Sequence, residues 1–82
     1  MNNNEKDIIF VLIEVFPGHI EEVIRELKKI DNVVEVNAVT GVFDIIIKIE
    51  DTNINKAIDT VVHEIRAIES IKNTETLITL KM

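Results

Sequence analysis

Two short stretches of this chain hold the polar residues that are best placed to do chemistry. Residues 40–44 lie between two apolar runs, where a tight hairpin is expected, and Gly41 supplies the positive φ that such turns require. Asp44 places a carboxylate one residue into the returning strand. Thr74 and Thr76 are two residues apart, so that both hydroxyls would face the same side of a strand. Together these groups could form a small polar pocket for a zwitterion.

A simpler interpretation of the same residues needs no ligand. Gly41 would then be only a turn residue, and Asp44 would only cap the turn. Because isolated turn glycines are common, turn chemistry alone favours this simpler interpretation by about two to one.

The other residues that could do chemistry form no recognisable site. His19 and His63 each lack a second ligand at a metal-binding spacing. The chain has no cysteine and no tyrosine, and its one serine, Ser70, has no base at a recognisable spacing. We therefore expect no metal, no cofactor and no catalytic activity.

Length and charge limit the class of protein. A chain of 82 residues forms one domain. A domain of this size buries only about 60% of its unfolded surface, so that oligomerisation is its most available source of extra stability. The formal charge of −6, from nine basic and fifteen acidic residues, argues against direct nucleic-acid binding. No segment resembles a signal peptide or a membrane span, which favours a cytoplasmic protein without a membrane partner.

Hydrophobic periodicity alternates between the patterns of strands and helices. Each helical segment carries an apolar stripe at spacings of three and four, and the apolar runs between them are rich in β-branched residues. This order predicts an α+β fold of the ferredoxin-like βαββαβ type, a four-stranded antiparallel sheet with two helices on one face. The expected elements are a strand at 8–16, a helix at 20–30, strands at 33–39 and 43–50, a helix at 54–68 and a strand at 74–81.

Apolar residues occupy both faces of the predicted sheet. In the first strand, Ile9 and every second residue after it belong to one face, and Ile8, Phe10 and Leu12 belong to the other. Ile46 of the third strand lies on this second face as well. Two helices cover only one face of such a sheet, and a solvated second face normally carries polar residues. We therefore expect a homodimer in which the second face, with Ile8, Phe10, Leu12 and Ile46, packs against the same face of another copy.

The order of elements and two motifs resemble the C-terminal domain of Lrp/AsnC regulators, which is called RAM, for regulation of amino-acid metabolism. The motifs are Val39-Thr40-Gly41-Val42-Phe43-Asp44 and Thr74-Glu75-Thr76. The resemblance covers residues 7–82 and leaves residues 1–6 as an expected disordered tail. It implies dimers that pair through their sheets into an α+β barrel and assemble further into octamers.

The resemblance also implies a ligand site between dimers for an amino-acid effector. The hairpin residues Thr40, Gly41, Val42 and Phe43 would offer backbone groups to this ligand. Asp44 would pair with its α-ammonium group, and Thr74 and Thr76 would contribute hydroxyls. Phe43 stands where the family often has tyrosine, so that a phenol hydrogen bond is absent.

Regulators of this family carry a helix-turn-helix domain ahead of the RAM unit, whereas only MNNNEKD precedes the first expected strand here. The resemblance thus implies a stand-alone RAM protein, which modulates transcription without binding DNA itself and whose partners include full-length Lrp/AsnC regulators. Two alternatives remain open at this point. One is an ACT-like amino-acid-binding domain, for which Pro17-Gly18 after the first strand is suitable. The other is a small enzyme on a dimeric α+β barrel, although the isoleucine-rich strands leave little space for a polar active site.

Overall fold

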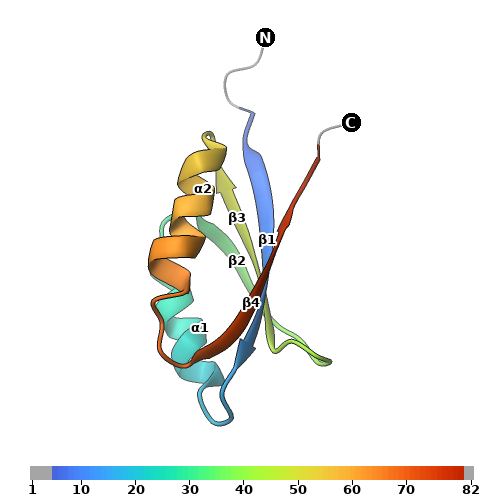
Figure 1. Cartoon of the computed structure of the whole chain (residues 1–82), viewed down its shortest axis with the longest axis vertical. Coiled ribbons are helices and arrows are strands. Elements are labelled where there is room, and N and C mark those ends of the chain that lie inside the picture. Colours follow the sequence, from blue (N-terminus) through green and yellow to red (C-terminus); the bar gives the residue numbers. More distant parts are fainter. Residues whose placement is uncertain (1–4, 81–82) are drawn as a thin grey trace.

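Four strands and two helical segments make up the fold of the computed structural model, which describes residues 5–80 (Figure 1). The strands form one antiparallel sheet in the order β2-β3-β1-β4, and both helical segments cover the same face of it. This is the predicted α+β, ferredoxin-like arrangement. The elements are β1 (Asp7–Val15), α1 (Ile20–Lys28), β2 (Val33–Ala38), β3 (Ile45–Asp51), α2 (Ile54–Thr60), the π-helical turn η1 (Val61–Ile65) and β4 (Ile71–Ile78).

Aliphatic side chains fill the space between the sheet and the helices. Val23 and Leu27 bring the apolar stripe of α1 onto this core, and Ala57 and Ile65 do so from α2 and η1. From the sheet, alternate residues of the two central strands are fully buried, as a period of two requires. They are Ile9, Val11, Ile13, Ile45, Ile47 and Ile49.

Several of the predicted boundaries were wrong. The first strand ends at Val15, because the chain turns at Phe16, whose N–H donates a hydrogen bond to the Ser70 carbonyl oxygen at 3.0 Å. The second helix is not uniform: after Thr60 it widens into η1, in which the Arg66 N–H donates to the Val61 carbonyl oxygen at 3.1 Å. The last strand begins at Ile71, three residues earlier than expected, and ends at Ile78.

The two helical segments start differently. The Asn53 side chain caps α2 by accepting a hydrogen bond from the Asn55 N–H at 2.9 Å. No side chain caps α1, but Glu21 and Glu22 lie in its first turn, where acidic residues favour the helix dipole.

The sheet face away from the helices is bare in the single chain (Figure 1). We call it the open sheet face; register and burial assign to it the half-buried residues Ile8, Phe10, Leu12, Ile46 and Lys48 and the exposed Leu77. This face is less apolar than the sequence pattern predicted. Lys48 lies on it between two carboxylates, with its Nζ 3.6 Å from Glu35 Oε2 and 3.3 Å from Glu50 Oε2.

Two expectations concern the chain ends and the membrane. Of the expected disordered tail, residues 1–4 lie outside the described residues, and Glu5 and Lys6 precede β1 without belonging to it. None of the helices within residues 5–80 is long and apolar enough to cross a membrane.

Candidate functional site

The β2–β3 hairpin carries the glycine motif and extends away from the sheet (Figure 1). Gly41 has φ +123°, the positive value that the sequence predicted for this turn. Thr40 and Gly41 are exposed, and the Val42 side chain next to them is 81% exposed. The tip of the hairpin therefore presents backbone groups and one apolar side chain to the surroundings.

Asp44 fastens the base of the hairpin to β1. Its Oδ2 accepts a hydrogen bond from the Val15 N–H at 2.8 Å, and its own N–H donates to the Ile13 carbonyl oxygen at 2.9 Å. These bonds lie beside the irregularity between Glu14 and Val15, where the pairing of β1 with β4 shifts register. One carboxylate oxygen thus has a structural use, and Oδ1 accepts no hydrogen bond from residues 5–80.

Thr74 and Thr76 face the helix side of β4, the edge strand. They pair with Ile13 and Val11 of β1, whose side chains are buried against the helices. Both threonines line a cavity of about 650 Å³ between β4 and the second helical segment, which we call the β4 cavity. Its lining residues are Ile58, Val61, Val62 and Arg66 from the helical side and Ile71, Lys72, Asn73, Thr74, Thr76 and Ile78 from β4.

Within one copy of the chain, the hairpin and the threonines do not meet in one pocket. Thr74 pairs with Ile13, which pairs on its other side with Ile45, so that β1 lies between Thr74 and the strand that follows the hairpin. Adjacent strands are about 4.8 Å apart, which separates these two outer strands by roughly 10 Å. No residue of 40–44 lines the β4 cavity.

Sequence reasoning missed the two cations of the β4 cavity, Arg66 and Lys72. The signal for Arg66 was its spacing, because it follows Ile58 and Val62 at intervals of four and so continues their helical stripe. Within residues 5–80 its side chain makes no ion pair or hydrogen bond, whereas Lys72 Nζ lies 3.6 Å from Glu14 Oε2. The cavity is therefore lined by two cations and no carboxylate.

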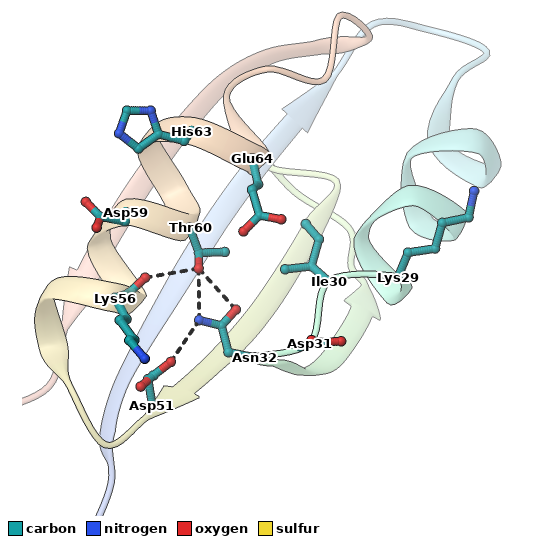
Figure 2. A pocket seen from close by; sticks show the side chains of 10 residues that line it. All are labelled: Lys29, Ile30, Asp31, Asn32, Asp51, Lys56, Asp59, Thr60, His63 and Glu64. Carbon is teal, nitrogen blue, oxygen red and sulfur yellow. Dashed lines mark hydrogen bonds between the residues drawn. The ribbon is translucent and has the colours of Figure 1, made fainter.

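A second cavity, of about 400 Å³, lies between the end of α1 and α2 (Figure 2). The Asn32 amide donates hydrogen bonds to Thr60 Oγ1 at 2.8 Å and to Asp51 Oδ2 at 3.2 Å. Asp51 Oδ1 also accepts a hydrogen bond from the Asn53 N–H at 3.1 Å. This bond first, and the bond from the Asn32 amide after it, hold the pKa of the Asp51 carboxyl below its ordinary value. Because these polar groups satisfy one another, we interpret the network as a structural link between α2 and the ends of two strands.

The histidines do not build a catalytic or metal site. His19 Nδ1 lies 2.7 Å from Glu22 Oε1 and 3.3 Å from Ser70 Oγ, a contact that the sequence did not indicate. Nucleophilic catalysis requires a carboxylate that orients one ring nitrogen while the other ring nitrogen takes the proton of the serine. Here Glu22 and Ser70 contact the same ring nitrogen, so that this arrangement is absent. No group of three or more metal-binding side chains occurs in the described part of the chain.

Comparisons with known proteins give the chain its context. The family model for the Lrp/AsnC ligand binding domain matches residues 8–82. The HTH-type transcriptional regulator FL11 of Pyrococcus furiosus is 33% identical over 75 residues, which are 92% of this chain and 49% of FL11. The chain thus spans about half the length of the curated relatives that it matches.

Solved structures give the same result for the fold. AsnC from E. coli has a TM-score of 0.84 and 27% identity, over 93% of this chain and 52% of AsnC. A transcriptional regulator from Neisseria meningitidis, solved in complex with L-Met, has a TM-score of 0.81 over 92% of this chain and 50% of that one, at an identity of 17% that shows the fold alone.

In these relatives the domain serves regulation rather than catalysis. The family match also favours the predicted Lrp/AsnC resemblance over the ACT-like and enzyme alternatives. Family model, curated relatives and fold agree, and we conclude that this chain belongs to the Lrp/AsnC ligand-binding domain family.

Proposed function

We propose that this domain binds an amino-acid effector and, through its assembly state, modulates transcription by regulators that carry a DNA-binding domain. The observation that supports this most directly is the β4 cavity, where Thr74 and Thr76 present hydroxyls beside apolar and cationic side chains. The L-Met bound by the related fold from Neisseria meningitidis agrees with an amino acid as the class of ligand.

The effector site in this proposal is shared between two copies of the chain. One copy provides the β4 cavity, and the other provides the hairpin with Thr40, Gly41, Val42, Phe43 and Asp44. The hairpin is suited to this because its tip is exposed and lines neither of the two cavities described above. Its backbone groups would contact the ligand, and the free Oδ1 of Asp44 would accept a hydrogen bond from the α-ammonium group.

The open sheet face is the proposed dimer interface. Ile8, Phe10, Leu12 and Ile46 are already half-buried by their neighbours, and burial against a second copy would remove the rest of their apolar surface from water. Complete burial of such a side chain contributes roughly 1.5–3 kcal/mol, and these residues would gain part of that. Dimers formed in this way leave the hairpins free to join them into octamers.

Direct DNA binding is not part of the proposed function. The net charge of −6 opposes contact with phosphates, and the described residues 5–80 are accounted for by the ligand-binding fold. An effect on transcription would then need a full-length Lrp/AsnC partner, in the cytoplasm.

Thermal unfolding in the presence of each of the twenty amino acids tests the proposal. At least one amino acid should raise the midpoint of unfolding, because a ligand that binds only the folded state stabilises it. A Thr74→Val/Thr76→Val double variant keeps the side-chain shapes and removes the hydroxyls, so that it should respond less to the same amino acid. Light scattering on the same samples should show dimers or octamers. A wild-type protein that no amino acid stabilises would contradict the proposed function.

A further inference from the structure

We infer that Arg66 in the β4 cavity binds the α-carboxylate of an aliphatic amino acid, with Thr74 and Thr76 beside it. This inference rests on the proposed function, because it assigns the ligand chemistry of the same site. It concerns a residue outside both sequence motifs, on the helical side of the cavity.

The first support is the sign of the charges. Asp and Glu outnumber Lys and Arg in this chain by fifteen to nine, yet the lining of the β4 cavity includes Arg66 and Lys72 and no carboxylate. A surface cavity with this lining attracts an anion and repels a cation. The carboxylate end of a zwitterion therefore fits here, whereas its ammonium end needs an acceptor from outside the cavity.

The second support is that only one of the two cations is free. Lys72 lies 3.6 Å from Glu14, while the Arg66 guanidinium has no side-chain partner among residues 5–80. A guanidinium has five N–H donors in a planar fork that matches a carboxylate in two parallel hydrogen bonds. The backbone of Arg66 is fixed by its N–H bond to the Val61 carbonyl oxygen, which closes the π-helical turn. Such turns occur frequently at functional sites.

The third support concerns the ligand's side chain. Ile58, Val62 and Ile78 line the same cavity and are 36%, 45% and 51% exposed, respectively. An aliphatic side chain that packs on them would remove apolar surface from water on both sides of the contact. The two threonines supply hydrogen bonds at the β4 wall, so that the polar end and the apolar end of the ligand each have a partner.

Calorimetry with the full chain and paired ligands tests the inference. The ligands are L-isoleucine, L-isoleucinamide, which lacks the carboxylate, and the 2-oxo acid of isoleucine, which lacks the ammonium group. Arg66→Gln should lower the affinity for L-isoleucine about tenfold or more, the usual effect of losing a hydrogen bond to a charged group. The same variant should lower the affinity for the 2-oxo acid by a similar factor. The affinity for the amide, which is lower in the wild type, should not change.

Lys72→Gln is the matched control, since it removes the same charge from the same cavity but from a side chain already paired with Glu14. Lys72→Gln should lower the affinity for L-isoleucine clearly less than Arg66→Gln does. Arg66→Lys keeps the charge without the fork and should restore part of the affinity. Because the Arg66 and Lys72 side chains are both exposed, all three variants should fold, which circular dichroism would check.

The outcomes separate this inference from the proposed function. If L-isoleucine binds the wild type and Arg66→Gln equally, the inference is wrong and the proposed function stands. The same holds if other amino acids bind and no aliphatic one does, or if the amide binds the wild type as tightly as the acid. If no amino acid and no analogue binds, both fail.

Discussion

Asp44 offers a test that separates a turn cap from a ligand contact, because two substitutions remove different parts of its chemistry. Asp44→Ala removes the acceptor of the Val15 N–H, which lies 2.8 Å from Oδ2 in a partly buried position. A lost hydrogen bond to a charged group costs about 1.5–3 kcal/mol in free energy of unfolding. For a domain of this size each kcal/mol lowers the midpoint of thermal unfolding by about 4–8 °C, so that a decrease on the order of 10 °C is expected.

Asp44→Asn keeps an acceptor for the Val15 N–H and removes only the charge. Its stability should therefore stay within about 1 kcal/mol of the wild type, the worth of a neutral hydrogen bond. Its affinity for the effector should nevertheless fall by about 1.5–3 kcal/mol, or roughly ten- to 150-fold, if Oδ1 binds the α-ammonium group of the ligand.

Thermal unfolding at one protein concentration measures the stability of both variants, and calorimetry measures their affinity for the effector. The effector is whichever amino acid stabilises the wild type. An Asn variant with unchanged affinity would refute the ligand contact and leave Asp44 as a turn cap alone. An Ala variant as stable as the wild type would refute the structural reasoning instead.

Three further predictions concern assembly, DNA and acid stability. Leu12→Asp on the open sheet face should abolish the dimer in light scattering, because an unpaired buried carboxylate costs several kcal/mol. The control Ile20→Asp, on the helix side, should leave the dimer intact. A Leu12→Asp variant that still forms dimers would contradict the proposed interface. The pure protein should not shift DNA mobility even at low salt, and a salt-dependent shift would overturn this expectation. The lowered pKa of Asp51 means that its bonds stabilise the fold above the unfolded-state pKa of about 3.9 and that this contribution is lost as pH falls through the lower folded-state value. Asp51→Asn should make acid unfolding less steep below about pH 4. An unchanged acid transition would argue that the hydrogen bonds of Asp51 with the Asn53 N–H and the Asn32 amide do not stabilise the fold.

The sequence predicted the fold well because its signals were local. Alternation of buried and half-buried residues in β1 and β3 and the apolar stripe of α1 each follow from a period that a short window contains. The start of β4 was missed because Ile71-Lys72-Asn73 shows no alternation, and its strand conformation comes from pairing with Val15 and Glu14 of β1.

The candidate site was harder because its contacts are distant in sequence. The partner of the Asp44 carboxylate, Val15, is 29 residues away, and a hydrogen bond of this kind leaves no local pattern. Arg66 was missed because its place in the cavity depends on how the second helical segment packs along β4. The shared face of Thr74 and Thr76 was predicted correctly, because it needs only a period of two.

The π-helical turn makes the geometry of the β4 cavity sensitive to chain length. In an α-helix each residue advances by about 100° around the axis, so that deletion of one residue within Val61–Ile65 would rotate everything after it relative to α2. Ile58, which precedes the turn, would keep its place, while the Arg66 side chain would leave the cavity. Relatives with a regular helix at this position would then present a different residue to the ligand. One residue inserted or deleted between Val62 and Arg66 would change effector preference while leaving every lining side chain in the sequence.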